Sequence, residues 1–313
     1  MAICMTDEIA APRCQGRDVA AVLVTFHADA GFSARLGRIS RQAGIVIVVD
    51  NGPADAENRL REIAADPAVE LILNGENLGV ARALNIGVRR AIALGYRWAL
   101  LLDQDSEVKD DMVSTLLTVQ ASYPDGDRLA VIGSGFEVVG RQVSAAVADR
   151  VCQGEPWQEA PYVITSGSLL SLAAYSAIGP FREDFFIDSV DTEFCLRAAA
   201  RGYRVIRTRK ALMSHAIGSP TAHRWLWMTK STSNHPPDRR YYMARNDTVM
   251  LREYGNYAAG IWALKSLRRC LRQSKRIVLY ENMKASKIIA IAHGWWDGVR
   301  GRMGPRRRQA KSD

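Results

Sequence analysis

The fold of this chain is indicated most directly by residues 98–106, Trp-Ala-Leu-Leu-Leu-Asp-Gln-Asp-Ser. The run from Trp98 to Leu102 is continuously apolar, which is typical of a parallel strand buried on both faces of its sheet. The run is followed by Asp103 and Asp105, and extended backbone sends side chains two positions apart in the same direction. Two carboxylates that point into one cleft are suitable ligands for a hard divalent cation. On this stretch alone, a second interpretation stays open, in which the acids only begin a turn and cap a helix.

Apolar strands alternate with amphipathic helices on both sides of this stretch. Short apolar runs predict strands at residues 19–26, 44–50, 69–73 and 129–133. Helical periodicity predicts helices at residues 33–42, 56–65, 80–94 and 110–122. This alternation is typical of an α/β protein with a mostly parallel sheet and helices on both faces. Ligands of such sheets bind outside the carboxyl ends of the strands, where Asp50, Asp103 and Asp105 are expected. Three acids from two strands therefore favour a nucleotide and metal site.

A second group of acids, Asp188, Asp191 and Glu193, precedes a helix expected at residues 194–201. Acids in a first helical turn are stabilised by the helix dipole, and this structural role accounts well for Glu193. It accounts less well for Asp188, which follows an aromatic run. A carboxylate at a helix N-terminus that also faces a cleft can act as a general base.

The charge of the chain is divided unevenly. The net charge of the 313 residues is +9, but residues 201–313 hold 25 Lys and Arg against 6 Asp and Glu, a net +19. The preceding residues hold 17 against 27, a net −10. This asymmetry suggests an anionic partner for the basic part, and a diphosphate substrate, anionic lipid or nucleic acid would each fit.

The C-terminal part combines basic and apolar residues. Residues 261–293 have a helical pattern in which Lys and Arg alternate with apolar residues, and Trp295 and Trp296 follow. A solvated helix face and a membrane-interface helix both fit this pattern. We expect a loose tail at residues 1–17, a catalytic domain at 18–255, and a basic helical region at 256–313 that contacts a membrane surface or another subunit.

The protein is expected in the cytoplasm, with contact to the inner face of the cell membrane. The N-terminus lacks the basic and apolar regions of a signal peptide, and no apolar stretch reaches the roughly 18 residues of a membrane span. The five cysteines show no metal-binding spacing, which is typical of reduced cytosolic thiols.

The motifs, taken in order, resemble those of the family 2 glycosyltransferases with the A-type fold. More narrowly, they resemble the bacterial rhamnosyltransferases of polysaccharide and O-antigen assembly. The resemblance covers about residues 18–255 and is carried by VLVTFHAD, VVDNGP, NGENLGVARALNIGVRRA, LLDQDS, TSGSLLS, FFIDSVDTEFCLRAAARGYRV, SHAIGS and RRYYMARN.

The resemblance implies a binding role for several residues. Thr25 and Asp50 would contact the nucleoside. Asp103 and Asp105 match the DXD motif, which would hold Mg²⁺ or Mn²⁺ on the diphosphate, and Asp103 would also touch the ribose. His215 would lie near the metal and the diphosphate.

The resemblance also implies catalytic and phosphate-binding residues. Asp191 matches the position of the catalytic base, and Arg240 and Arg245 would reach the leaving phosphates. Val190 departs from the family pattern, because many relatives have Glu there, so Asp188 and Glu193 remain candidate bases beside Asp191.

The expected activity is metal-dependent, inverting transfer of a sugar from a nucleotide donor, because one base without a covalent nucleophile inverts the anomeric carbon. The favoured donor is dTDP-rhamnose, and the acceptor would be a lipid-linked glycan. A UDP-hexose or UDP-galactofuranose donor is an alternative. An alternative from a different functional class is a non-catalytic protein that binds membrane or nucleic acid. The complete set of acids at Asp103, Asp105 and Asp191 argues against this alternative. We expect no nucleic acid partner.

Overall fold

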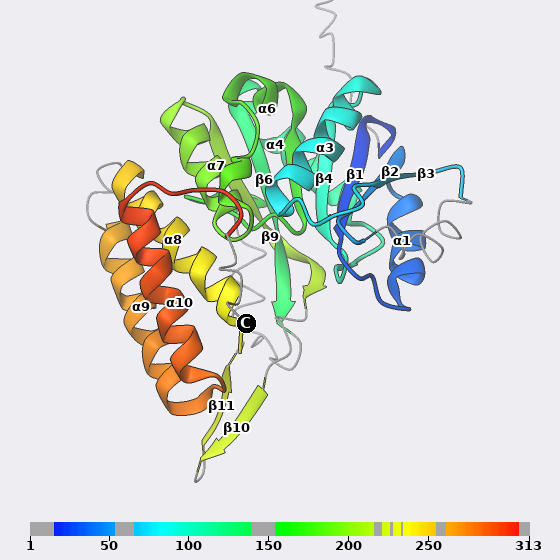
Figure 1. The fold of residues 1–313 in the computed structure, drawn as a ribbon. Coiled ribbons are helices and arrows are strands. Elements are labelled where there is room, and N and C mark those ends of the chain that lie inside the picture. The colour runs from blue at the N-terminus through cyan, green and yellow to red at the C-terminus, as the bar shows by residue number, and fades with distance from the viewer. Residues whose placement is uncertain are drawn as a thin grey trace, which may run out of the picture.

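The computed structural model describes residues 16–53, 66–138, 154–215, 221–225, 228–232, 234–254 and 261–306. A mixed sheet with helices on both faces forms most of the molecule, and three long helices lie beside it, on the left of Figure 1. The α/β class and the helical C-terminal region are therefore as predicted. The helix expected at residues 56–65 lies outside the described residues.

Four parallel strands form one half of the sheet. In spatial order they are β3 (Val69–Leu73), β2 (Ile45–Asp50), β1 (Val19–Thr25) and β4 (Trp98–Asp103). Thr25 pairs with Asp50 across β1 and β2, and Val24 pairs with Asp103 across β1 and β4. The predicted strand ends therefore meet at one edge of the sheet.

The other half of the sheet is mixed, so antiparallel strands join the predicted parallel ones. β8 runs antiparallel to both β4 and β6, whereas β6 and β9 are parallel. The short strands β5 and β7 both pair antiparallel with β9. The bounds are β5 (Glu107–Val108), β6 (Leu129–Val138), β7 (Trp157–Glu159), β8 (Ser168–Ser171) and β9 (Arg204–His215), and a separate hairpin consists of β10 (Thr221–Trp225) and β11 (Met228–Thr232).

Helices cover both faces of the sheet, so its strands are apolar on both sides. The helices around it are α1 (Phe32–Ser40), α3 (Val80–Ala93), α4 (Met112–Ser122), α6 (Leu172–Ile178) and α7 (Val190–Ala200). Successive residues of a strand point to opposite faces. Ala20 and Val22 of β1 accordingly join one core cluster with α3, α6 and α7, and Val19, Ala21 and Leu23 join another with α1 and α4.

Two predicted boundaries differ from the structure. The apolar run at residues 162–172 predicts a strand, but only β8 forms. A turn in which the Ser168 N–H donates to the Thr165 carbonyl oxygen at 3.0 Å precedes it, and the Ser171 hydroxyl accepts a hydrogen bond from the Ala174 N–H and begins α6. Helix α7 begins at Val190 rather than at residue 194. Asp191 and Glu193 therefore both lie in its first turn.

The three C-terminal helices are α8 (Pro237–Tyr254), α9 (Ile261–Tyr280) and α10 (Lys284–Val299). The helical pattern predicted for residues 261–293 is confirmed, whereas α8 was not predicted. Two buried glycines let α10 approach α8 closely. A Cβ atom on Gly294 would lie 2.3 Å from the Tyr241 carbonyl oxygen, and one on Gly298 would lie 2.8 Å from that of Arg245. Among the described helices, none combines the length and apolarity that crossing a bilayer requires.

A buried group of charges also joins these helices. The guanidinium of Arg240 lies 2.7 Å from one carboxylate oxygen of Glu281, and the ammonium of Lys287 lies 2.9 Å from the other. All three side chains are almost completely buried. Removal of one member of such a group leaves a buried charge without compensation, which is strongly destabilising.

The close approach of α10 to α8 can be tested by adding volume at Gly294. We expect Gly294→Val to lower the free energy of unfolding by about 1–3 kcal/mol, because the new side chain meets the backbone of α8. Urea denaturation measures the change. Ala292→Val is the matched control, since Ala292 is exposed on the same helix. Equal stability of both variants would show that the glycines are not needed for packing.

Candidate active site

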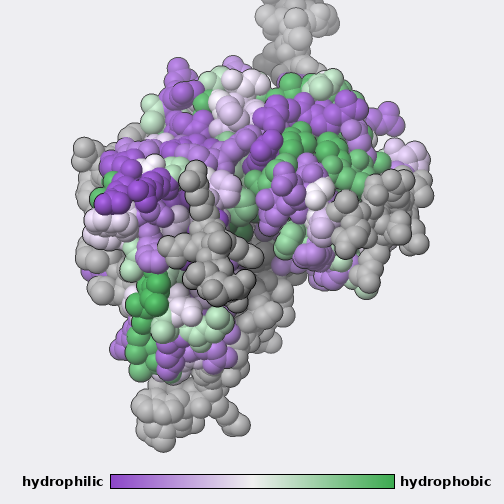
Figure 2. All heavy atoms as spheres, in the orientation of Figure 1, coloured by the Kyte–Doolittle hydropathy of each residue, from purple (hydrophilic) through white to green (hydrophobic). Residues whose placement is uncertain are grey.

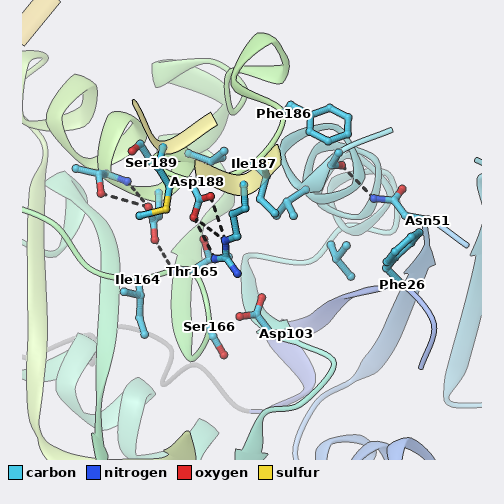
Figure 3. A pocket seen from close by; sticks show the side chains of 18 of the residues that line it. Phe26, Asn51, Asp103, Ile164, Thr165, Ser166, Phe186, Ile187, Asp188 and Ser189 are labelled. Atoms are coloured by element: carbon cyan, nitrogen blue, oxygen red, sulfur yellow. Dashed lines mark hydrogen bonds and ion pairs between the residues drawn. The ribbon is translucent and has the colours of Figure 1, made fainter. Parts of the chain in front are cut away.

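A cleft of about 720 Å³ opens at the carboxyl ends of β1 and β4 (Figure 3). It is lined by the ends of these two strands, by residues 164–166, by the segment 186–192 and by one face of α8. Small-molecule sites commonly have volumes of about 300–1,000 Å³. The cleft therefore lies where an α/β sheet is expected to bind a ligand, and it is large enough for one.

Asp103 and Asp105 both line this cleft. The Ser106 N–H donates to the Asp103 carbonyl oxygen, and the Asp103 N–H donates to the Ser106 hydroxyl, each at 3.1 Å. The side chain of Gln104 accepts a hydrogen bond from the Phe26 N–H at 2.7 Å. The two acids thus begin a turn that is tied to the end of β1. They cap no helix, because α4 begins only at Met112.

Thr25 also lines the cleft, whereas Asp50 is not among the lining residues. The Thr25 hydroxyl donates to one oxygen of the buried Asp50 carboxylate at 2.6 Å, and the Gly52 N–H donates to the other at 2.8 Å. The neighbouring Asn51 lines the cleft instead and donates to the Gly79 carbonyl oxygen at 3.1 Å. Asp50 therefore lies behind Thr25, to which it is hydrogen-bonded, and does not itself line the cleft.

The loop at residues 186–189 forms another wall of the cleft and has an uncommon backbone. Phe186, Asp188 and Ser189 have φ values of 65°, 65° and 61°, in the left-handed region that residues with a side chain seldom adopt. The Phe186 carbonyl oxygen accepts a hydrogen bond from the Val80 N–H at 2.7 Å. The loop thereby satisfies a free N–H at the start of α3.

Two buried side chains of α8 hold this loop. The Asn246 amide nitrogen donates to the carbonyl oxygens of Phe185, Ile187 and Asp188 at 3.1, 2.8 and 2.8 Å. Arg245 donates to the Phe185 carbonyl oxygen at 2.9 Å. These contacts offset the cost of the left-handed residues, which is of the order of 1–3 kcal/mol each.

Asp188 and Arg239 form an ion pair at the cleft. A terminal guanidinium nitrogen of Arg239 lies 3.0 Å from one Asp188 oxygen, and its Nε lies 3.1 Å from the other. Burial lowers the pKa of Arg239, but the carboxylates of Asp188 and Asp103 outweigh burial and raise it. Arg239 therefore presents a permanent positive charge among the acids of the cleft.

Asp191 lines the cleft from the first turn of α7. Its carboxylate accepts hydrogen bonds from the Thr192 N–H at 2.7 Å and from the Thr165 N–H at 3.3 Å. Burial raises the pKa of Asp191, and these hydrogen bonds lower it without cancelling the rise, to which the charge of Asp188 adds. The carboxylate is thus a stronger proton acceptor than an exposed aspartate would be.

The structure does not bring three other predicted residues to the cleft. Arg240 is buried against Glu281, and Arg245 is buried against loop carbonyl groups, so neither lines it. Glu193 is completely buried and paired with Arg197 at 2.9 Å. The expectation that these two arginines reach the cleft is therefore corrected. His215 ends β9, where its backbone pairs with Val138, and its side chain is outside what the structure describes.

Sequence reasoning missed the face of α8 that lines the cleft. Arg239, Met243 and Asp247 line it, and they are four residues apart, as required for one face of a helix. The chosen arginines lie on other faces of the same helix. Recognition of α8 from the sequence would have separated Arg239 from Arg240.

The acids of the cleft fit a divalent cation that keeps some of its water. Asp103 and Asp105 supply carboxylate oxygens, which are the donors that Mg²⁺ and Mn²⁺ prefer. Within the described part of the chain, no group of three His, Cys, Asp or Glu side chains is close enough to hold a metal alone. A cation at this site would need further ligands, such as water or phosphate oxygens.

The role of the α8 side chains can be tested at Asn246. We expect Asn246→Ala to lower the free energy of unfolding by about 1–3 kcal/mol and to weaken nucleotide binding in the cleft, because three loop carbonyl groups lose their donor. Urea denaturation and calorimetric titration with a nucleoside diphosphate measure the two effects. Asn282→Ala, at an exposed asparagine after α9, is the control. Unchanged stability and binding in Asn246→Ala would contradict the assignment.

Comparison with known proteins gives a family match and one long relative. Residues 41–177 match the family model for glycosyl transferase family 2. The chain is 27% identical over 296 residues to a protein of Shigella flexneri named dTDP-rhamnosyl transferase RfbF. This similarity covers 91% of the chain and 96% of the relative.

Two solved structures have a similar fold. The first is residues 1–349 of TarS from S. aureus, with a TM-score of 0.56 and 14% identity, covering 91% of this chain and 81% of that one. The second is GalNAc-T7 with UDP, GalNAc and Mn²⁺, with a TM-score of 0.57 and 11% identity. It covers 90% of this chain, which spans only 56% of GalNAc-T7. The fold is thus the A-type glycosyltransferase fold. The match of residues 41–177 to the glycosyl transferase family 2 model and the similarity to a named rhamnosyltransferase over most of the chain support a glycosyltransferase enzyme.

Proposed function

We propose that this chain transfers L-rhamnose from dTDP-rhamnose to a hydroxyl group of a glycan acceptor, with inversion at the anomeric carbon. The arrangement of the cleft carries the proposal. Asp103 and Asp105 lie at the end of β4, Asp191 lies at the start of α7, and all three line one space with Arg239. Sugar transfer from a nucleoside diphosphate needs a cation site, a positive charge near the leaving group and a separate base.

In this mechanism Asp191 is the general base. It accepts the proton of the acceptor hydroxyl while the hydroxyl oxygen bonds to the anomeric carbon and the bond from that carbon to the phosphate oxygen breaks. The electron pair of that bond leaves with the nucleoside diphosphate. Attack from the face opposite the leaving group inverts the anomeric carbon. Asp191 is favoured over Asp188 and Glu193, because these two are paired with Arg239 and Arg197.

Arg239 is proposed to stabilise the leaving diphosphate in place of Arg240 and Arg245. Its guanidinium lies at the cleft, and its present partner, Asp188, is a single carboxylate. A diphosphate carries more negative charge than a carboxylate and can accept paired hydrogen bonds from guanidinium. Donor binding would therefore draw Arg239 from Asp188 toward the phosphates.

Asp103 and Asp105 are proposed to hold Mg²⁺ or Mn²⁺. When bound, such a cation neutralises negative charge on a diphosphate. GalNAc-T7, which shares the fold, was crystallised with Mn²⁺. His215 remains a proposed additional ligand by resemblance alone.

The proposed donor and acceptor are supported by the relative and by the class of reaction. The relative from Shigella flexneri is named a dTDP-rhamnosyl transferase, and this name favours dTDP-rhamnose. UDP-sugars remain the alternative, since GalNAc-T7 was crystallised with UDP. We propose a lipid-linked glycan of cell-surface polysaccharide assembly as the acceptor, and a cytoplasmic location at the inner membrane face.

The base assignment predicts that Asp191→Asn lowers kcat by about 10²- to 10⁴-fold, because general base catalysis contributes a factor of this size. Donor affinity should be unchanged, since Asp191 acts on the acceptor. Product formation and calorimetric titration with the donor measure the two quantities. If Asp191→Asn kept the wild-type rate, or if only Asp188→Asn lost activity, the general base would have to be a residue other than Asp191.

A pH profile gives an independent check of the same base. Only the ionised carboxylate accepts a proton, so kcat/KM should fall as the pH falls through the raised pKa of Asp191. Asp188→Asn removes a negative charge that adds to this rise, and the acid limb should therefore move to lower pH. A limb that stays in place would show that another group controls it.

The donor and metal assignments can be tested by titrating the full chain with dTDP-rhamnose and with UDP-sugars. We expect binding of dTDP-rhamnose with Mg²⁺ or Mn²⁺ and weak binding after addition of EDTA, because the acids alone repel a diphosphate. Asp103→Asn/Asp105→Asn should remove the metal dependence. Arg239→Gln should weaken binding of the donor. Asp125→Asn, which changes an exposed acid outside the cleft, is the control for the aspartate variant and should bind as the wild type does. Preference for a UDP-sugar would keep the mechanism and change the donor.

A further inference from the structure

Helix α10 exposes an apolar face that no described part of the chain covers. Five large side chains on it are between 46% and 55% exposed: Ile288, Ile289, Trp295, Trp296 and Val299. With Ala292, which is also exposed, they form the α10 apolar face. At 100° per residue, the six positions fall within an arc of about 120°. Exposed apolar groups gathered on one side of a helix indicate an interaction surface.

The opposite side of α10 is fixed to the protein. Ala290, Gly294 and Gly298 are buried against α8, and Ala290 shares an apolar cluster with Tyr241 and Tyr242. The apolar face is therefore held outward by packing on its reverse side. Figure 2 shows apolar, green side chains gathered over α10 at the lower left of the molecule.

The charges around this face are positive. On the helical wheel, Lys284 and Arg300 lie about 20° outside the two edges of the apolar arc, and both are exposed. The guanidinium of Arg300 lies 4.2 Å from the centre of the Trp296 ring. Tryptophan together with Lys and Arg at the edge of an apolar stripe is typical of a helix that lies in a membrane interface.

The acids of this region are turned inward. Residues 261–300 contain nine Lys and Arg and two acids, Glu281 and Asp297. Glu281 is buried between Arg240 and Lys287, and Asp297 accepts a hydrogen bond from the Tyr241 hydroxyl at 2.8 Å. Among the described side chains of α9 and α10, the exposed charged groups are therefore Lys and Arg.

The apolar surface continues into the turn between the two helices. Val278 and Leu279 near the end of α9 are about half exposed, and Met283 in the turn is 63% exposed. Exposed Arg272, Lys275 and Arg276 precede them on α9. Helices α9 and α10 lie side by side in Figure 1. The exposed apolar residues of the turn that joins them therefore lie at the same end of the helical group.

We propose that α9 and α10 bind the surface of an anionic lipid bilayer, with the α10 apolar face inserted at the level of the headgroups. Anionic lipid complements both the apolar arc and its basic edges. A second copy of the chain fits less well, because symmetric contact through this face would bring the basic edges of two copies together. The surface is independent of the donor assignment. It belongs to the helical group whose α8 lines the cleft, which places a lipid-linked acceptor near the site.

The test is flotation of the full chain with vesicles of phosphatidylcholine alone and with an equal mixture of phosphatidylcholine and phosphatidylglycerol. We expect binding to the anionic vesicles to exceed binding to the neutral ones by at least about tenfold. Trp295→Ser/Trp296→Ser should reduce anionic binding by at least about tenfold. Lys284→Gln/Arg300→Gln should reduce the difference between the two kinds of vesicle. The matched control is Ile92→Ser/Leu94→Ser, which changes two exposed apolar residues at the C-terminal end of α3. This variant should bind as the wild type does.

Two outcomes would overturn the proposal. One is equal flotation of the wild type and the Trp295→Ser/Trp296→Ser variant, or no flotation of either. The other is a dimer of the wild type that becomes monomeric in this variant, measured by light scattering, together with no vesicle binding, which would assign the face to a second copy. Titration of the same samples with dTDP-rhamnose shows separately whether the cleft is intact. Failure of vesicle binding with an intact cleft would leave the glycosyltransferase proposal unaffected.

Discussion

The cleft depends on the hydrogen bonds between Asn246 and the loop that precedes α7. This single amide holds three carbonyl groups of a segment whose backbone is left-handed at three residues. The same segment supplies the carbonyl group at the start of α3, carries Asp188 and leads into Asp191. One side chain of α8 is therefore linked, through this loop, to the start of α3 and to two acids. Phe186 adds an aromatic contact, since its ring stacks on Tyr242 at 5.0 Å.

This constraint makes the C-terminal helices part of the same structural unit as the cleft. α8 contributes Arg239, Met243 and Asp247 to the cleft wall, and its other faces are packed against the loop and against α10. The sheet supplies the acids at the end of β4, and α8 supplies the positively charged guanidinium of Arg239 near them. The domain boundary expected near residue 255 would separate α8 from α9 and α10, which pack on it. Across that boundary, Gly294 and Gly298 of α10 pack directly against the backbone of α8.

The sequence predicts the first half of the fold well for a physical reason. Strands buried on both faces must be apolar throughout, so Trp98–Asp103 and its neighbours are visible as short runs, and their carboxyl ends locate the acids. The direction of β8 has no such local signal, because its pairing partners are distant in sequence. The prediction that Arg240 and Arg245 face the cleft was wrong for a similar reason. Arg239 and Arg240 differ only in helical phase, which is decided by the packing of α8 rather than by the motif itself.

The buried charges between Arg240, Glu281 and Lys287 have a practical consequence for anyone who shortens the chain. A truncation after α8 would remove the carboxylate, the ammonium and the helices that bury all three groups, so Arg240 and the apolar surface at Tyr241 and Tyr242 would be exposed to water. Helix α8 would then lose the packing that stabilises it, and the contact of Asn246 with the loop would be weakened. An attempt to improve solubility by deleting the last two helices would therefore disturb the cleft without removing a residue that lines it. Substitutions on the exposed side of α10 avoid this damage.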